Sequence, residues 1–160
     1  MKAVCGALLA FLSFVGAAAA QAEGPGAMAD AHVRRALMLV LKQIHLAQCG
    51  DGKRCEPATS EEYDTPPIPL AVARRIIQTG VSSGAAQWCG IDWQATIFVP
   101  MMSRLREGEN WSDRQLAIAA LMHGVYQGQT YGPLLARGKC DDETRARVAA
   151  SAPDWNKPLS

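Results

Sequence analysis

Apolar residues recur at helical spacing along most of the chain, and no segment keeps the strict alternation that is typical of a β-strand. The first predicted helix covers residues 30–48, with Asp30 as its N-cap and Gly50 as the stop that follows it. Its apolar stripe consists of Val33, Leu37, Val40, Leu41 and Ile44. Because Met38, Leu39 and Leu46 widen the stripe, we expect this helix to be buried on more than one side.

Two further helices are predicted before residue 110. One starts at Pro69, since proline suits a first helical turn in which its N–H would have no partner, and it continues to Trp88. The other runs from Asp92 to Arg106 and contains Pro100. Proline lacks an N–H and crowds the preceding turn, so Pro100 should kink or split this helix.

The fourth helix has the clearest start in the chain. Ser112 and Gln115 match a capping box, and Trp111 and Leu116 flank the box as a hydrophobic staple. The apolar pattern predicts that this helix reaches Gly132.

A short last helix is predicted from residue 141 or 142 to residue 150, because acids open it and arginines follow, as the helix dipole favours. Residues 153–160 are predicted to form a flexible tail unless Trp155 docks it. The expected fold is therefore all-α: an irregular bundle of four main helices plus a short C-terminal helix. No linker divides it, so residues 23–152 should form one helical domain.

Residues 50–67 are polar and rich in glycine, proline and acids, which predicts a long loop. Its acidic residues suggest a calcium-binding site, but they do not have the ligand spacing of an EF-hand loop. We therefore interpret the segment as solvated and predict no metal site.

The first 22 residues have the layout of a secretory signal peptide. Lys2 supplies a positive start, residues 3–15 are apolar, and small residues allow cleavage before Gln21 or before Glu23. We favour cleavage after Ala22. The apolar run is too short for a membrane span, so we expect the mature chain in the periplasm or outside the cell.

Four cysteines remain after this cleavage: Cys49, Cys55, Cys89 and Cys140. An even number in an exported chain indicates two disulfides, and the lack of a C-x-x-C pair disfavours a zinc or redox-active site. In an up-and-down bundle the helix ends would bring Cys49 to Cys55 and Cys89 to Cys140. We predict this pairing.

The chain has 16 basic and 15 acidic residues, and cleavage would remove only Lys2 among them, which leaves no net charge. A nucleic-acid binder or a membrane-surface binder needs a basic excess, so both classes are disfavoured. No second apolar run approaches the roughly 20 residues of a membrane span.

Glycines repeat at a spacing of four in two predicted helices: Gly80 and Gly84 in the second, and Gly124, Gly128 and Gly132 in the fourth. Glycine inside a helix costs about 1 kcal/mol relative to alanine, so the repetition indicates a compensating gain. We predict that these glycines allow the two helices to pack closely. The alternative is a groove floor that admits a ligand or partner.

Two tryptophans, Trp88 and Trp93, flank Cys89 and are predicted to pack over a disulfide. Alternatively, one of them or Trp111 is an exposed anchor for a partner. His123 lies in an apolar stretch and is expected to be a packed core residue, because no second histidine or acid follows at metal-ligand spacing.

Common catalytic motifs, including G-x-S-x-G, S-x-x-K, the P-loop and H-E-x-x-H, are missing from the sequence, and no cofactor is indicated. We therefore expect a small exported protein that binds a protein partner, for example an inhibitor or accessory subunit. The alternative is a cell-envelope hydrolase that uses His123 with Asp92 or Glu107. The sequence leans toward the binding protein.

Overall fold

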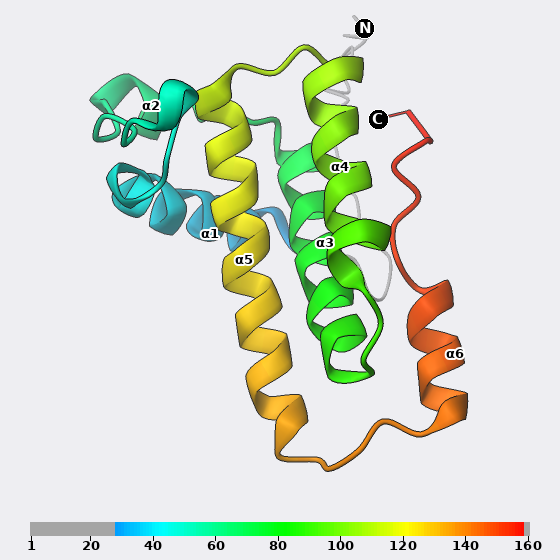
Figure 1. Cartoon of the computed structure of the whole chain (residues 1–160). Coiled ribbons are helices and arrows are strands. Elements are labelled where there is room, and N and C mark those ends of the chain that lie inside the picture. The colour runs from blue at the N-terminus through cyan, green and yellow to red at the C-terminus, as the bar shows by residue number, and fades with distance from the viewer. Residues whose placement is uncertain (1–27, 159–160) are drawn as a thin grey trace, which may run out of the picture.

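The computed structural model describes residues 28–158, which form six α-helices and contain no β-strand (Figure 1). This confirms the all-α class. The predicted signal peptide, residues 1–22, lies outside the described residues. The helices are α1 (Asp30–Gln43), α2 (Ser60–Asp64), α3 (Leu70–Trp88), α4 (Val99–Ser103), α5 (Asp113–Leu135) and α6 (Asp142–Ala150).

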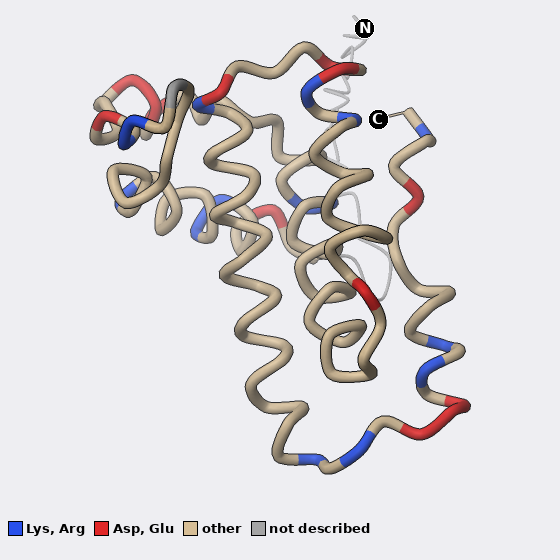
Figure 2. Tube along the Cα trace, viewed as in Figure 1, with Lys and Arg blue, Asp and Glu red and all other residues tan. Residues whose placement is uncertain are grey.

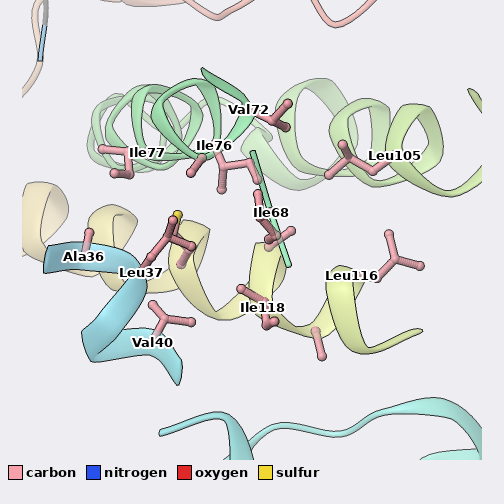
Figure 3. Close-up of a cluster of buried hydrophobic side chains, with 14 of the residues drawn as sticks. Ala36, Leu37, Val40, Ile68, Val72, Ile76, Ile77, Leu105, Leu116 and Ile118 are labelled. Carbon is pink, nitrogen blue, oxygen red and sulfur yellow. The ribbon is translucent and has the colours of Figure 1, made fainter. Parts of the chain in front are cut away.

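The two long helices α3 and α5 form the centre of the bundle, and α1 packs against both of them. α6 contacts α3 on another side. Their apolar faces enclose one core, in which Leu37 of α1, Ile76 of α3 and Ile118 of α5 are completely buried (Figure 3). Burial of such side chains from three helices at once is the main source of stability in a bundle of this kind.

The first helix is shorter than predicted, because a 3-10 turn at Ile44–Leu46 follows Gln43. The expectation of burial on several sides is wrong. Leu39 is 60% exposed and Leu46 is 58% exposed. Each helical residue advances by about 100°, so Leu39 points away from the face that carries Leu37 and Leu41.

The segment between α1 and α3 is not a loop throughout. Gly50–Gly52 forms a 3-10 turn and Ser60–Asp64 forms α2. α2 starts with a capping box, in which the backbone N–H of Glu62 donates to Thr59 and the carboxylate of Glu62 accepts from the N–H of Thr59. This T-x-x-E signature is visible in the sequence and locates the helix start.

The third predicted helix is a continuous helical rod whose winding changes along its length. π-helical turns at Gln94–Phe98 and Arg104–Gly108 enclose α4. The N–H of Val99 donates to the carbonyl of Gln94, five residues earlier, just before Pro100 in the first turn of α4. The wider turn accommodates proline without breaking the rod.

α5 begins at the predicted capping box, where the N–H of Gln115 donates to the Ser112 hydroxyl and the N–H of Ser112 donates to the Gln115 side chain. It passes Gly132 and Pro133 and ends at Leu135. α6 starts after Asp141, whose side chain accepts from the N–H of Thr144.

Both predicted disulfides are present. Cys49 pairs with Cys55, and Cys89 at the end of α3 pairs with Cys140 before α6. The first bond closes a tight turn, in which the N–H of Cys49 also donates to the carbonyl of Lys53. The second ties the C-terminal end of α3 to the segment just before α6.

The tail beyond α6 is docked on α3 through Trp155, which is only 4% exposed. Its indole N–H donates to the hydroxyl of Thr79 over 3.0 Å, and the guanidinium of Arg75 lies 4.7 Å from the ring centre. Arg75 also donates to the carbonyls of Asp154 and Pro158. These contacts hold residues 154–158 on the bundle, so the tail is docked through Trp155, which is the alternative that the sequence left open to a flexible tail.

Candidate functional site

α3 and α5 approach each other closely at two glycines of α3. A side-chain Cβ built on Gly80 would lie 2.6 Å from the carbonyl oxygen of His123, and one on Gly84 would lie 2.5 Å from that of Gln127. Real Cβ atoms do not come this near to a backbone oxygen, so both positions require glycine. The spacing of four places the two glycines on the face of α3 that touches α5.

The glycines of α5 do not take part in this contact, which corrects the predicted role of Gly124, Gly128 and Gly132. All three are exposed, and a Cβ on any of them would meet nothing within 4 Å. α5 presents its larger residues to α3 instead and turns these glycines outward.

His123 lies inside the α3–α5 contact and is 1% exposed. Its Nε2 is 2.9 Å from the hydroxyl oxygen of Ser83, which is completely buried. The ring of Trp93 stacks on the imidazole at 5.8 Å between centres, and Phe98 lies at 4.8 Å. Burial lowers the pKa of His123 to about 4, so the imidazole is neutral at pH 7.

The acids that the sequence pairs with His123 have other roles. Asp92 is exposed and accepts a hydrogen bond from the N–H of Ala95 in the next helical turn. Glu107 is exposed in the final π-helical turn of the rod. The hydrogen bond of His123 goes to Ser83. The structure therefore does not assemble the proposed acid–base group.

Each of the three tryptophans considered as partner anchors is half-buried. The indole N–H of Trp88 donates to the carbonyl of Gly138 over 2.8 Å, next to the Cys89–Cys140 bond. Trp93 packs on His123, and Trp111 packs against the hydrophobic core before α5. Their contacts are those of packing residues.

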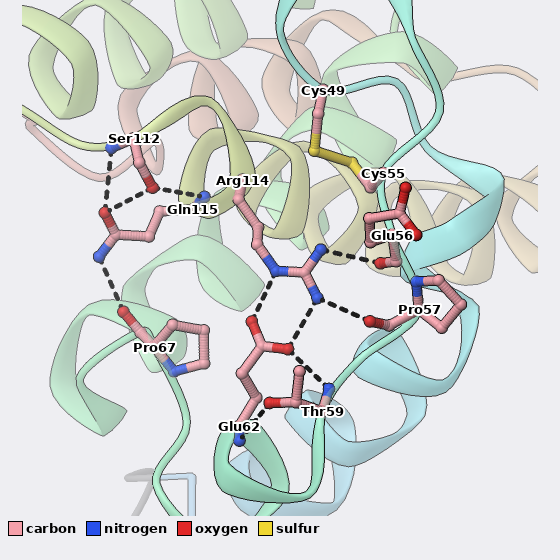
Figure 4. A network of polar contacts seen from close by, with 10 residues as sticks. All are labelled: Cys49, Cys55, Glu56, Pro57, Thr59, Glu62, Pro67, Ser112, Arg114 and Gln115. Atoms are coloured by element: carbon pink, nitrogen blue, oxygen red, sulfur yellow. Dashed lines mark hydrogen bonds and ion pairs between the residues drawn. A yellow bond between two sulfur atoms is a disulfide. The ribbon is translucent and has the colours of Figure 1, made fainter.

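A polar network joins α5 to the segment that contains α2 (Figure 4). Arg114 forms two hydrogen bonds to the Glu62 carboxylate, of 2.6 and 2.7 Å, and donates to the carbonyls of Glu56 and Pro57. The guanidinium holds the pKa of Glu62 below its ordinary value. A hollow of about 530 Å³ lies beside this network and the Cys49–Cys55 bond.

We interpret the Arg114 network as a brace rather than a binding site. Four hydrogen bonds already hold the guanidinium against the loop, which leaves it poorly placed to bind an added anion. Among residues 28–158, no cluster of three or more histidine, cysteine or acidic side chains could hold a metal ion.

A depression lined mainly by apolar residues lies on the surface between α1 and α5. We call it the α1–α5 groove. It has a volume of about 180 Å³ and is lined by Ala36, Leu39, Val40, Gln43, Val125, Tyr126 and Gln129. At one side the Tyr126 hydroxyl lies 2.9 Å from Nε2 of His32, which positions the phenol ring.

The α5 wall of this groove belongs to a long uncharged segment. Between Arg114 and Arg137 the chain has no lysine, arginine, aspartate or glutamate, and the tube of α5 is tan over this length (Figure 2). On the α1 wall, Leu39 projects from the surface with 60% of its area exposed. None of the residues that line the α1–α5 groove is charged.

The groove and its neighbours were not predicted as site residues. Leu39 was assigned to a buried face, and Ser83 and Arg114 were not singled out. For Leu39 a signal exists in the sequence, because its helical phase is opposite to that of Leu37 and Leu41. The partners of Ser83 and Arg114 lie 40 and 52 residues away, which no local pattern reveals.

Comparisons of the chain with protein-family models, with curated proteins and with solved structures give no significant match. None of the described helices combines the length and the apolar character needed to cross a membrane.

Proposed function

We propose that this chain is an exported helical binding protein that uses the α1–α5 groove to hold a protein partner, for example as an inhibitor or accessory subunit. The observation that carries the proposal is the exposure of Leu39 at a groove whose other wall is uncharged. An apolar surface of this kind is costly to leave in water and gains free energy when a partner covers it.

The size of the groove indicates what it holds. A dry apolar cavity of about 150 Å³ accommodates a molecule such as benzene. The 180 Å³ groove therefore suits one large aliphatic or aromatic side chain of a partner. The Gln43 and Gln129 side chains at its rim add polar groups that can orient the partner backbone.

Export is supported by the two disulfides, since such bonds persist in oxidising compartments. The signal-peptide pattern of residues 1–22 agrees with this compartment. Expression of the full chain, followed by fractionation and N-terminal sequencing, tests it. We expect the mature chain to begin at Glu23 and to leave the cytoplasm, and retention of Met1 in the cytoplasm would contradict the proposal.

Capture from an envelope extract tests the groove itself. The bait is the mature oxidised protein, and the variants are Leu39→Asp and Val99→Asp. Val99 is a matched control because it is 53% exposed but lies on α4, outside the groove. We expect one partner to be retained by the wild type and by Val99→Asp and to be lost with Leu39→Asp. Equal recovery with all three baits would contradict the proposal.

The alternative of a hydrolase that uses His123 has less support from the geometry. A general base must reach the proton it removes, and His123 is 1% exposed with burial lowering its pKa to about 4.

A further inference from the structure

The exposed rim of the α1–α5 groove carries an apolar side chain between two cations. Leu39, which is 60% exposed, lies between Arg35 and Lys42 on α1. At about 100° per residue, both cations point within about 60° of the direction of Leu39, and both are exposed. We call these three residues the α1 rim. At about 1.5 Å per residue, its two cations are about 10 Å apart along the helix.

The charge of Arg35 acts on the groove. Burial raises the pKa of Tyr126, which lines the groove on the α5 side, and the positive charge of Arg35 opposes this rise. Arg35 also precedes Ala36, the first residue of α1 that lines the groove. The cation therefore lies near the end of the groove at which Tyr126 meets His32.

Neither wall of the groove supplies an acid to the rim. Residues 31–50, which include all of α1 after its first residue, contain no aspartate or glutamate, and neither do residues 115–136. Asp30, at the start of α1, is paired with Arg74 of α3. Within the part of the chain that the structure describes, neither cation of the α1 rim has an ion-pair partner. This unbalanced positive charge favours the approach of an acidic group.

We propose that the α1–α5 groove binds an acidic segment of a partner protein, in which aspartate or glutamate flanks one large apolar side chain. The apolar side chain fills the groove beside Leu39, and the flanking carboxylates lie against Arg35 and Lys42. An extended chain rises about 3.3 Å per residue, so about three residues span the distance between the two cations. The inference rests on the proposed function, because it names the chemistry of the segment that the groove holds.

The form of this surface favours a protein segment over other anions. The groove has the volume of one large side chain, and its rim has two cations rather than a continuous basic face. A nucleic acid or an anionic membrane is bound through many cations spread over a wider surface. The chain has 16 basic and 15 acidic residues, so it has little basic excess for either.

The cations and the leucine should contribute in different ways. Exposed charges at the edge of an interface act mainly on the association rate and on the choice of partner, and salt weakens their effect. A buried apolar contact supplies more of the affinity and depends little on salt. Changes to the charges of the rim can therefore be told apart from a change to Leu39.

Selection from a library of random peptides displayed on phage tests the chemistry of the occupant. The bait is the mature oxidised protein, and peptides that also bind Leu39→Asp are removed first. We expect the remaining peptides to share a large apolar residue with an acid within about two positions on each side. Peptides without acids would overturn the inference and keep the groove. Failure to obtain any peptide that depends on Leu39 would contradict the proposed function itself.

Isothermal titration calorimetry with one selected peptide measures the role of the rim. Arg35→Glu combined with Lys42→Glu, the rim variant, should weaken binding at least about tenfold at low salt, because two attractive contacts become repulsive. Arg137→Glu combined with Arg145→Glu changes the net charge equally, at exposed positions before and within α6, which lies away from α1 (Figure 1). This control should bind like the wild type. Circular dichroism establishes that each variant is folded.

Salt and lipid vesicles complete the test. The screening length falls from about 10 Å at 0.1 M salt to about 3 Å at 1 M, so the wild-type affinity should fall toward that of the rim variant as salt is added. Equal affinities of the two proteins at low salt would overturn the acidic partner. Phosphatidylglycerol vesicles should not bind the protein in a sedimentation assay. Binding by the wild type that is lost in the rim variant would assign the rim to an anionic membrane instead.

Discussion

The hydroxyl oxygen of Ser83 lies 2.9 Å from Nε2 of His123, and the α3–α5 contact buries both side chains almost completely. The rings of Trp93 and Phe98 lie against the imidazole and exclude water from it. The folded chain therefore favours the neutral form of His123, and protonation must oppose the packing of the two central helices.

Stability should consequently fall as the solution becomes acidic. The pKa of His123 is lowered from 6.5 to about 4 in the folded chain, so the unfolded chain binds the proton first. The full stability contributed by this site is present above pH 6.5 and is lost as the pH falls toward 4. The loss reaches about 3 kcal/mol, which urea unfolding at a series of pH values measures.

Three variants separate this effect from other titrations. Ser83→Ala should keep the pH dependence, because burial rather than the hydrogen bond lowers the pKa. His123→Gln should remove the loss assigned to this site, whereas His45→Gln at an exposed position should retain it. The same pH profile in wild type and His123→Gln would show that other groups are responsible.

Glycine-to-alanine variants should have opposite effects on the two central helices. Gly84→Ala places a Cβ 2.5 Å from the Gln127 carbonyl oxygen, so the backbones must separate at a cost of about 1–3 kcal/mol. Gly128→Ala adds a methyl group in open space and should stabilise the helix by about 0.5–1 kcal/mol. Thermal melts at low concentration distinguish them, and destabilisation by both would contradict the outward placement of Gly128.

Local signals in the sequence predict much of the fold, because they act within a few residues. The Ser112–Gln115 capping box locates the start of α5, and the helix ends lead to the correct disulfide pairing. The start of α2 was missed although Thr59 and Glu62 carry the same kind of signal. The polar composition of residues 50–67 predicts a loop, and a capping motif followed by a single short helix does not change that composition.

The sequence does not reveal in the same way which face of α5 points outward and which packs against α3. α5 lacks charged residues from 115 to 135, so its pattern has no polar side that identifies the outward face. Spacing alone shows that Gly124 and Gly128 share a face but not whether that face meets α3. The α3–α5 register, which brings Ser83 to His123, arises from core packing between segments 40 residues apart.

The two disulfides should differ in their contribution to stability. Cys89–Cys140 spans 51 residues and Cys49–Cys55 spans 6, so loop-closure entropy gives about 4 and about 2 kcal/mol respectively. Replacement of each pair by alanines, followed by urea unfolding, measures the difference. Equal losses from the two double variants would show that strain or residual structure outweighs loop entropy.

Trp155 should anchor the C-terminal segment to α3 strongly enough to affect global stability. The side chain is 4% exposed and packs under Arg75, so Trp155→Ala should cost about 3–5 kcal/mol. Trp155→Phe retains much of the apolar contact but removes the donor to Thr79, and Thr79→Val removes the acceptor. Each should cost less than the alanine variant, because loss of one hydrogen bond changes stability by about 1 kcal/mol. Urea unfolding measures all three, and wild-type stability in Trp155→Ala would show that the tail is not anchored by this residue.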